Sequence, residues 1–395
     1  MSEPLKKLNN HEFTEPENIL QLADDTLILA ENEDYLTLKF QKILEYTQSK
    51  YIIVNMDKTK YMQLDENPSF NELHLKNESI KAVNPQEGYT YLGFSLSYAS
   101  EVTKLVEYNF TKKKMNIGKF YAWLQINHNT PFPLKMKILY NCMFPALLYS
   151  SEIWGDLRCL ENKLLLIERK ALKACLGIKQ GTSDGILYIE INKPDIVASI
   201  YRNQYHFYQR FVNLDPMDSS ARRIWQKYMD IGDVDKPYLE HYEILENHQL
   251  SNNIQIKKQG IRDSDKSMDI RYRDLFGLEY NDTLYNSMVD DSYRTIITRW
   301  RLSSHKLFVE TGRYKKPYIP RDQRTCIICN LVEDETHALF LCKAHIMIRV
   351  NYRDLLNAYT TIGKLLNPTI VSDITRVAKY IREIERNMEK LKMIR

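Results

Sequence analysis

The chain has 395 residues, of which 44% are hydrophobic and 27% charged, and its formal net charge is +4. This length allows two or three domains with sizeable cores. The sequence contains no run of about 18 apolar residues and no apolar segment near its N-terminus, so we expect neither a membrane span nor a secretory signal, and hence an intracellular protein.

Charge is distributed unevenly along the chain. Residues 1–100 contain 9 lysines, no arginine and 16 acidic residues, a net charge of −7, whereas residues 101–180 contain 13 basic and 6 acidic residues, a net charge of +7. An acidic segment that holds metal, followed by a basic segment that holds a phosphate backbone, is typical of a polymerase palm and thumb. Unrelated neighbouring segments also differ in charge, so this asymmetry alone decides nothing.

Two adjacent carboxylates lie between two apolar runs in the segment Asn18–Ala30. The second run is rich in strand-forming residues, which predicts a hairpin with Asp24 and Asp25 exposed at its tip. Aspartate is also simply a common turn residue. The functional alternative is a Mg²⁺ site in a two-metal phosphoryl-transfer enzyme, because this hard cation prefers oxygen ligands.

Three pieces of the sequence follow one another in a recognisable order: Leu22–Thr26 (Leu-Ala-Asp-Asp-Thr), Tyr51–Met62 and Tyr91–Gly93 (Tyr-Leu-Gly). Together they resemble the later palm motifs of reverse transcriptases, and most of all those encoded by non-LTR (LINE-type) retrotransposons. The family has an aromatic residue where this chain has Leu22.

The resemblance implies roles for several side chains. In an intact relative, Asp24 and Asp25 bind Mg²⁺ for nucleotidyl transfer. Lys58 or Lys60 lies near the incoming nucleotide, where a cation stabilises pyrophosphate charge; the alternative for both lysines is a solvated turn. The hairpin that resembles the primer grip consists of Tyr91, Leu92 and Gly93, the glycine being expected where another backbone approaches closely.

Residues 101–127 have a helical pattern of apolar positions interrupted by three lysines, Lys112, Lys113 and Lys114. We interpret this segment as a thumb helix that presents cations to a template–primer backbone. The alternative is an ordinary solvated basic face. The segment from 131 to 155 resembles the one just after the palm in LINE-type enzymes, with the residues Tyr149, Glu152 and Trp154.

The remaining pattern predicts a mostly helical chain of the α+β class, with a partial palm built of antiparallel hairpins. We expect helices at 33–49, 160–175 (stopped by Gly177), 195–230 and 372–392, strands at 51–54 and 72–75, and a linker at 247–267. The expected organisation is a partial palm (1–100), a thumb-like helical region (101–180), a helical connector of unknown role (181–292), a Cys-His knuckle region (293–345) and C-terminal helices (346–395).

Four metal-ligating residues have the spacing C-x2-C-x7-H-x4-C: Cys326, Cys329, His337 and Cys342. Two thiolates on a tight turn, an imidazole and a third thiolate make a closed four-coordinate site, which is the structural Zn²⁺ arrangement. Metal binding itself drives the folding of such a module. His345 is an alternative to His337 as ligand but fits the spacing less well. The remaining alternative is three free thiols and a surface histidine at chance spacing.

This segment also resembles the Cys-His knuckle that follows the reverse transcriptase in non-LTR retrotransposon proteins. The residues before it resemble the family's lead-in to the knuckle, at Arg299, His305, Gly312 and Arg313. The resemblance implies RNA or DNA binding by the basic surroundings. It does not imply catalysis by zinc, because a fully protein-ligated ion has no open coordination position.

The favoured hypothesis is therefore a fragment of an RNA-directed DNA polymerase. A reverse transcriptase palm also needs fingers and a further metal-binding aspartate on an earlier strand, and we expect this chain alone to be inactive without them. The expected partners are an RNA template, a DNA primer, target DNA and other chains of the same element, in the nucleus. The alternatives are a non-catalytic RNA- or DNA-binding protein and a zinc-stapled helical interaction protein.

Overall fold

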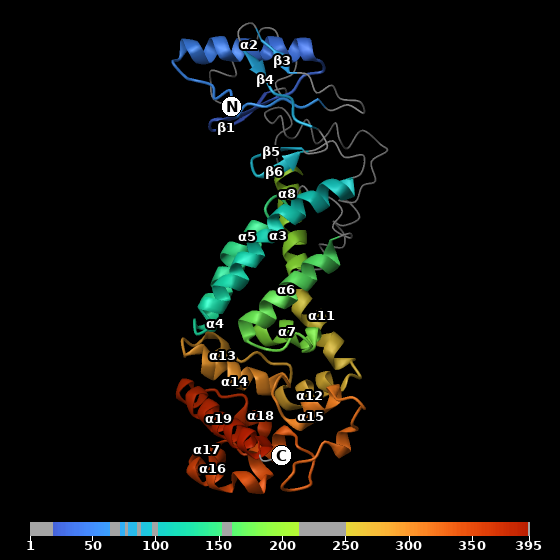
Figure 1. Cartoon of the computed structure of the whole chain (residues 1–395), viewed down its shortest axis with the longest axis vertical. Helices are drawn as coiled ribbons and strands as arrows, with labels where there is room; N and C mark the ends of the chain where they lie inside the picture. The colour runs from blue at the N-terminus through green and yellow to red at the C-terminus, as the bar shows by residue number, and fades with distance from the viewer. Residues whose placement is uncertain are drawn as a thin grey trace. The chain divides into compact units, whose positions relative to one another are not determined.

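The computed structural model describes residues 19–63, 72–75, 78–84, 88–96, 102–151, 160–212 and 250–393. These residues belong to two compact units (Figure 1). The described part of the first unit consists of residues up to 112 together with 204–212, and that of the second consists of residues 113–151, 160–203 and 250–393. Within these ranges no helix is both long and apolar enough to cross a bilayer.

The first unit combines short antiparallel hairpins with helices, as the α+β prediction required. Each strand pairs with the next one along the chain, so the described strands form two-stranded sheets. The elements are β1 (Ile19–Leu22), β2 (Asp25–Ile28), α2 (Glu33–Ser49), β3 (Leu73–His74), β4 (Ser79–Ile80), β5 (Tyr89–Tyr91), β6 (Phe94–Leu96) and the first part of α3 (Val102–Ile126).

A small apolar cluster holds this unit together. The buried members are Phe40 of α2, Tyr61, Leu73 of β3 and Ile80 of β4. Helix α2 begins where the Asn32 side chain accepts a hydrogen bond from the backbone N–H of Tyr35, which satisfies one of the free donors at a helix start. The predictions of a helix at 33–49 and a strand near 72–75 are thus confirmed.

The predicted strand at 51–54 is wrong. This segment has no ladder partner in the described part of the chain, and Tyr51 is 97% exposed and Ile53 93% exposed, whereas the half-buried Val54 packs against the apolar cluster. β-branched residues favour strands mainly because they pack on a half-buried pleated surface. Without a neighbouring strand at this place, the propensity of the Tyr-Ile-Ile-Val run does not decide its conformation.

The second unit is helical. Its elements after the shared helix α3 are α4 (Phe132–Ile138), η2 (Leu139–Met143), α5 (Phe144–Leu147), α6 (Glu161–Leu176), α7 (Asp184–Ile191), α8 (Ile196–Val212, shared with the first unit), α11 (Leu250–Arg262), α12 (Ser267–Phe276), α13 (Asp282–Asn286), α14 (Asp291–Arg301), α15 (Phe308–Thr311), η3 (Gly312–Tyr314), η4 (Arg321–Gln323), η5 (His337–Leu341), η6 (Lys343–His345), α16 (Ile346–Asn351), α17 (Arg353–Ala358), α18 (Ile362–Leu365) and α19 (Val371–Met393).

Several helix predictions are confirmed in this unit. Helix α6 ends at Gly177, whose φ of 68° is the left-handed conformation that glycine adopts without strain. Helix α3 matches the prediction for 101–127, and α19 matches that for 372–392. Helix α8 covers the first half of the range 195–230, and the rest of that range lies outside the described residues.

The predicted linker at 247–267 is wrong for residues 250–262, because helix α11 occupies them. Helix α11 packs against α7, with Ile261 buried and Lys257 2.8 Å from the Asp195 carboxylate. Its composition is polar, and polar contacts such as this ion pair help to hold it in place. Hydrophobic periodicity is the main sequence sign of a helix, so a helix held this way is easily missed.

A buried polar network connects four helices of the second unit. The Glu190 carboxylate of α7 accepts hydrogen bonds from the Arg301 Nε atom of α14 at 2.5 Å and from the hydroxyl groups of Tyr272 in α12 and Tyr285 in α13. The side chains of Glu190 and Arg301 are both 0% exposed. Arg301 also donates to the Leu366 carbonyl at 3.0 Å. The segment 181–292, predicted as a connector, thus contributes to the core of this unit.

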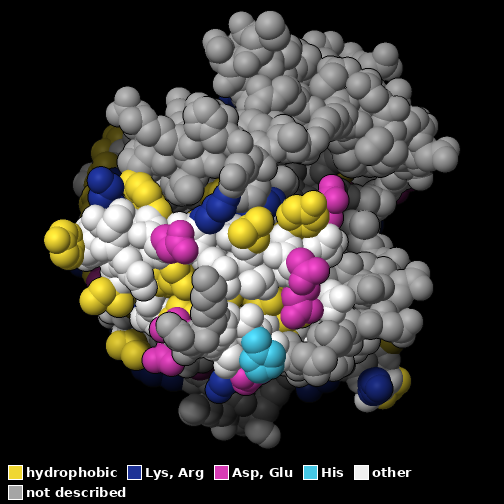
Figure 2. All heavy atoms as spheres, turned by 90° about the horizontal axis from the view of Figure 1, so that it is seen from above, with side chains coloured by type: hydrophobic (Ala, Val, Ile, Leu, Met, Phe, Trp, Pro, Cys, Tyr) yellow, Lys and Arg dark blue, Asp and Glu magenta, His cyan; other side chains and the backbone are white. Residues whose placement is uncertain are grey.

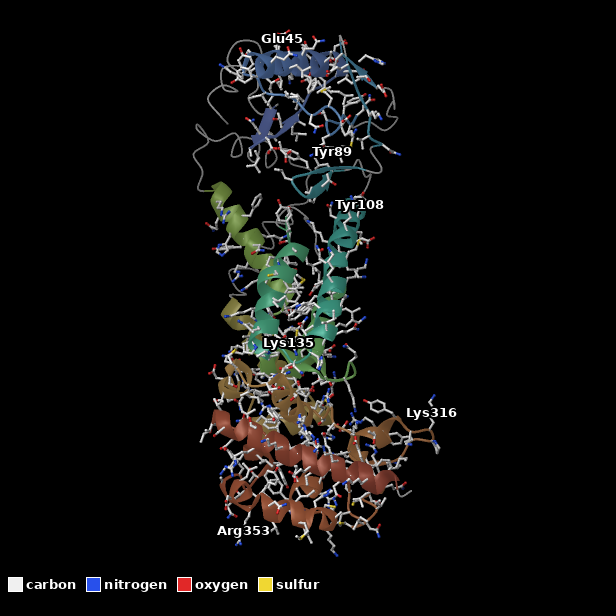
Figure 3. The ribbon with its side chains drawn as sticks, turned by 60° about the vertical axis from the view of Figure 1, so that its left-hand side comes forward. Glu45, Tyr89, Tyr108, Lys135, Lys316 and Arg353 are labelled. Carbon is white, nitrogen blue, oxygen red and sulfur yellow. The ribbon has the colours of Figure 1, made fainter. Side chains whose placement is uncertain are left out.

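A second buried group joins helices α4, α6 and α14. Lys135, labelled in Figure 3, lies 2.5 Å from the Asp291 carboxylate, and Arg294 donates to the same carboxylate at 2.7 Å. Arg294 also donates to the carbonyls of Cys175 and Leu176 at the end of α6. All three charged side chains are at most 4% exposed. Because each charge has a partner, their burial is tolerated.

Glu168 in α6 is a buried carboxyl whose protonation makes stability depend on pH. Burial raises its pKa from 4.5 to about 8, although Tyr188 donates a hydrogen bond to it at 2.8 Å. Between these two pH values the folded chain keeps a proton that the unfolded chain loses, so the free energy of unfolding falls as pH rises. Glu168→Gln should remove this fall, which amounts to a few kcal/mol since one pKa unit corresponds to about 1.4 kcal/mol. Urea unfolding between pH 5 and pH 9 measures it, and parallel curves for the two proteins would contradict the shift.

Candidate functional site

The two predicted Mg²⁺ ligands lie at the tip of the β1–β2 hairpin, as the sequence pattern predicts. Leu22 pairs with Asp25, so Ala23 and Asp24 form a two-residue turn. Both carboxylates are exposed, and Leu22 is 59% exposed. Ala23 has a φ of 54°, which glycine adopts far more readily than alanine. The two-residue hairpin turn accounts for this value, because such turns need a positive φ at their first central residue.

The second hairpin, β5–β6, turns at Leu92 and Gly93. Both residues have positive φ, 49° and 76°, and a two-residue turn with two such residues favours glycine at its second position. Turn geometry therefore accounts for Gly93 without the close backbone approach expected from the sequence. Burial and the charge of Asp25 raise the pKa of Tyr91. The first unit thus brings this turn close to the aspartate hairpin.

The described residues do not complete a metal site around Asp24 and Asp25. The one cluster of three or more histidine, cysteine or acidic ligands found in the described ranges is the Cys-His group discussed below. Lys58 is exposed and Lys60 half-buried, and no hydrogen bond or ion pair in the described part of the chain joins either to the aspartates. The Lys58 backbone N–H donates a hydrogen bond to the Asn55 Oδ1 atom at 3.2 Å, which fixes a local turn.

The outer face of α2 mixes two kinds of side chain. Figure 2 shows acidic and hydrophobic side chains interspersed, with some Lys and Arg side chains among them, over the described residues that it views. Tyr35 and Leu38 are 55% and 45% exposed, and Glu33, Asp34 and Glu45 are exposed beside them. The local acidity agrees with the net negative charge of residues 1–100 and disfavours contact with a phosphate backbone here.

The three lysines of α3 do not form one cationic face. Lys112 and Lys114 are exposed, and the Lys112 ammonium lies 4.4 Å from the centre of the Tyr108 ring. Lys113 is buried and donates a hydrogen bond to the Tyr149 carbonyl. The interpretation of Lys113 as a backbone-binding cation is therefore wrong, because successive residues of a helix point about 100° apart. Glu152 and Trp154 lie outside the described residues.

The Cys-His segment begins as a short β-turn structure. Thr325 and Val332 form an antiparallel bridge, the Cys326 N–H bonds the Leu331 carbonyl at 2.8 Å, and Asn330 adopts a φ of 54°. Asparagine is one of the few side chains that tolerates this conformation. The turn places Cys326 and Cys329 on one side of the knuckle.

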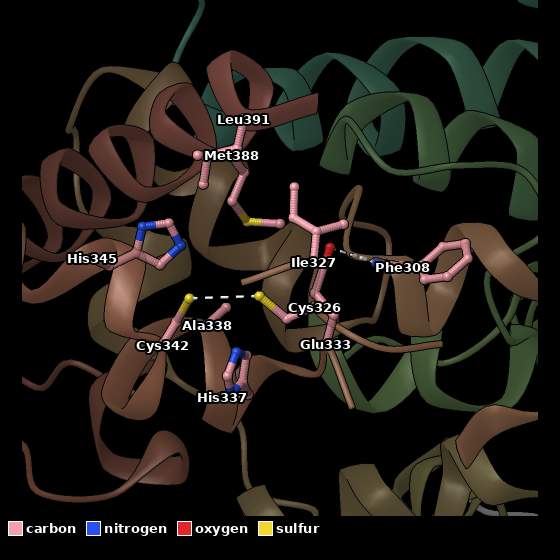
Figure 4. A pocket seen from close by; sticks show the side chains of 10 residues that line it. All are labelled: Phe308, Cys326, Ile327, Glu333, His337, Ala338, Cys342, His345, Met388 and Leu391. Atoms are coloured by element: carbon pink, nitrogen blue, oxygen red, sulfur yellow. Dashed lines mark hydrogen bonds between the residues drawn. The ribbon is translucent and has the colours of Figure 1, made fainter. Parts of the chain in front are cut away.

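The four predicted ligands converge. The Cys342 sulfur lies 3.8 Å from the Cys326 sulfur and 3.8 Å from the Cys329 sulfur, and all ligand atoms including a His337 nitrogen lie within 4.8 Å of one another. Figure 4 shows three of the four ligands, Cys326, His337 and Cys342. Thiolates bound at about 2.3 Å to one tetrahedral ion are about 3.8 Å apart, whereas bonded sulfurs are about 2.05 Å apart. The spacing therefore fits a metal ion such as zinc and does not fit a disulfide.

The histidine of the cluster is consistent with a ligand. Neither ring nitrogen of His337 has a hydrogen-bond partner in the described part of the chain, although the side chain is buried. A buried imidazole without partners is costly unless a ligand occupies it. His345, the alternative, accepts a hydrogen bond at Nδ1 from the Asn387 amide at 2.9 Å and lies outside the four-ligand cluster.

Burial opposes charge on the ligand side chains of the cluster. Burial raises the pKa of the Cys342 thiol to about 12 and lowers that of His337. Burial also opposes the charged form of Cys329, but hydrogen bonds from the Lys343 N–H and the neighbouring thiols lower its pKa overall. A neutral imidazole is the ligand form of histidine, and a coordinating divalent metal displaces the proton of a thiol.

Two acidic residues that the ligand pattern does not single out hold the knuckle against the rest of the second unit. Glu333 accepts a hydrogen bond from the Phe308 N–H at 2.9 Å. Glu335 lies 3.0 Å from His305 Nε2 and 2.7 Å from Arg271. Burial alone would raise the pKa of Glu335, but His305 and Arg271 lower it to about 2. The position of these acidic residues between the second cysteine and the histidine of the ligand pattern is the sequence feature that indicates this role.

The lead-in residues have structural roles around this module. Arg299 donates to the Gly177 carbonyl at 2.7 Å, and Arg313 lies 3.3 Å from Glu310. A Cβ atom at Gly312 would lie 2.9 Å from the Arg324 side chain, closer than real Cβ contacts come. Glycine here thus lets Arg324 pack under the knuckle.

Comparison with protein-family models, curated proteins and solved structures finds no match for the chain.

Proposed function

We propose that the chain is the C-terminal part of an RNA-directed DNA polymerase of a non-LTR retrotransposon. The observation that carries the proposal is the β1–β2 hairpin, which exposes Asp24 and Asp25 together at its tip in the same unit as the Tyr91–Gly93 turn. In this proposal Asp24 and Asp25 are Mg²⁺ ligands for nucleotidyl transfer, and Tyr91, Leu92 and Gly93 contact the primer.

The second unit supplies nucleic-acid binding in this proposal. Cys326, Cys329, His337 and Cys342 hold a structural Zn²⁺, which fixes the knuckle and takes no part in catalysis. Lys114 of α3 is an exposed cation of this unit that meets a phosphate backbone, together with Lys112, the exposed residue of the same helix at which the first unit ends. The partners are an RNA template, a DNA primer and target DNA, together with other chains of the same element, and the corresponding location is the nucleus.

A specific observation favours the second candidate, a non-catalytic RNA- or DNA-binding protein. No third histidine, cysteine or acidic ligand clusters with Asp24 and Asp25 within the described ranges. Two-metal catalysis fixes both ions with ligands from more than one element. In this alternative the hairpins of the first unit are a scaffold, and binding belongs to the second unit.

RNA-templated primer extension with the purified chain, Mg²⁺ and all four dNTPs tests whether this chain polymerises by itself. We expect no product above that of Asp24→Ala, because the described carboxylates fix at most part of a two-metal site. Binding of the same template–primer should remain and should weaken steeply with salt, as phosphate contacts do. Extension that Asp24→Ala abolishes would show that the chain is a polymerase, and an absence of binding at low salt would exclude both candidates.

A further inference from the structure

The segment Tyr314–Tyr318 (Tyr-Lys-Lys-Pro-Tyr), which we call the Tyr-Lys loop, exposes two aromatic rings just before the knuckle. Tyr314 and Tyr318 are 68% and 67% exposed. Lys315 and Lys316 between them are exposed, with no ion pair to another described residue. Figure 3 shows Lys316 on a loop that extends outward from the helices of its unit. A single exposed tyrosine is ordinary, but here two large exposed rings flank two exposed lysines within five residues.

The loop is held in place at its C-terminal end. Arg324 is buried, and it donates to the Ile319 carbonyl at 2.8 Å and to the Val309 carbonyl at 2.7 Å. Its guanidinium lies 5.4 Å from the centre of the Tyr318 ring. This contact supports one side of the ring while two-thirds of the side chain stays exposed. Tyr318 is therefore a pre-positioned surface on which a planar group can stack.

The chemistry of the loop selects among ligands. Exposed aromatic rings that alternate with cations match a nucleic-acid strand whose bases are unpaired, because each base stacks on a ring while its phosphate meets a cation. The bases of a duplex are stacked on one another and unavailable to such rings. An acidic peptide would satisfy the lysines but would leave both rings without a planar partner.

We propose that the Tyr-Lys loop binds single-stranded nucleic acid, with Tyr314 and Tyr318 stacking on unpaired bases and Lys315 and Lys316 contacting the phosphates between them. The inference rests on the proposed nucleic-acid binding of the second unit and names the form of nucleic acid that this surface takes. It places the strand beside the zinc knuckle, on residues that belong to neither the metal cluster nor the aspartate hairpin.

Fluorescence anisotropy with the full chain and zinc tests the proposal. The probes are a labelled oligouridine of about 20 nucleotides, long enough for one binding site, and an RNA duplex of the same length. Tyr314→Ala/Tyr318→Ala should weaken binding to oligouridine at least tenfold, since stacking contributes about 1–3 kcal/mol per base, without changing the salt dependence. Lys315→Gln/Lys316→Gln should reduce the slope of log affinity against log salt by about 1.4, two contacts at about 0.7 each.

Matched variants control for lost exposure and lost charge. Tyr35→Ala removes a 55% exposed tyrosine of α2 that lies in none of the motifs, and Lys364→Gln/Lys379→Gln removes two exposed charges elsewhere in the second unit. Both should bind oligouridine as the unmodified chain does. Circular dichroism checks that every variant keeps its helix content.

The outcomes separate this inference from the proposed function. If the chain binds oligouridine and the double tyrosine variant binds it equally well, the loop is not the site although nucleic-acid binding stands. Tighter binding to the duplex than to oligouridine, or displacement of oligouridine by polyglutamate at equal charge concentration, overturns the loop assignment as well. Absence of binding to either RNA at low salt overturns both the inference and the proposed function.

Discussion

Cys326→Ser is expected to lose zinc and to destabilise the knuckle. The purified chain should contain one zinc ion, and the variant should bind it more than a hundredfold more weakly, because even loss of an outer partner of a metal ligand weakens binding about 10- to 100-fold. Without the ion, Cys342 and His337 lose the partner that their burial requires. Apparent zinc-binding energies of small knuckles are about 10–16 kcal/mol, so loss of the metal should lower the thermal midpoint clearly.

A chromophoric chelator measures the zinc released, and limited proteolysis reports whether residues 325–345 become cleavable. Cys142→Ser is the matched control, because Cys142 is an exposed thiol outside the cluster. Zinc affinity should also fall on acidification, since each thiol must lose its proton to bind. Retention of one zinc by Cys326→Ser, with an unchanged thermal midpoint, would show that Cys326 is not a ligand.

Arg301→Met is expected to destabilise the second unit by about 3–5 kcal/mol, the usual cost of leaving one member of a buried ion pair alone. The variant removes two hydrogen bonds to Glu190, at 2.5 and 3.2 Å, and leaves that carboxylate buried with only two tyrosine hydroxyls. It also removes the donor to the Leu366 carbonyl. The urea midpoint, with the slope of the transition unchanged, measures the loss.

Two further variants make this test specific. Arg299→Met changes an exposed arginine of the same helix and should cost at most about 1 kcal/mol, the usual worth of a surface polar contact. Arg301→Met/Glu190→Leu should be more stable than Arg301→Met alone, because a buried pair replaced by apolar residues leaves no charge unpaired. If the double variant is no more stable than Arg301→Met, the destabilisation comes from lost packing and not from the unpaired Glu190 charge.

The sequence reveals the metal cluster because its ligands are close together in the chain. Cys326 and Cys329 lie on one short turn, and His337 and Cys342 follow at the two ends of η5. Spacing over so few residues limits the geometry strongly, so the ligand set can be predicted without a tertiary structure. The same holds for the Ala23–Asp24 turn, where an aspartate pair between two apolar runs fixes both the hairpin and its tip.

Contacts between distant residues are not predictable in this way. Glu190 and Arg301 are separated by 111 residues, and nothing in the local pattern of either tells which charge it meets. Glu190 does stand in an otherwise apolar run, which is a sign of a buried partner. The burial of Lys113 is unpredictable for a related reason. A run of three lysines indicates a charged helix face, but only the tertiary structure shows which of the three side chains points inward.

The separation of Glu190 from Arg301 also sets the timing of folding during synthesis. A ribosome that adds about 5–20 residues per second needs on the order of 5–20 s to make the 111 residues between them. Until Arg301 has been made, burial of α7 would place the Glu190 carboxylate in an apolar interior without the cation that balances its charge. We therefore expect helix α7 to pack into the interior of the second unit only after Arg301 has been made.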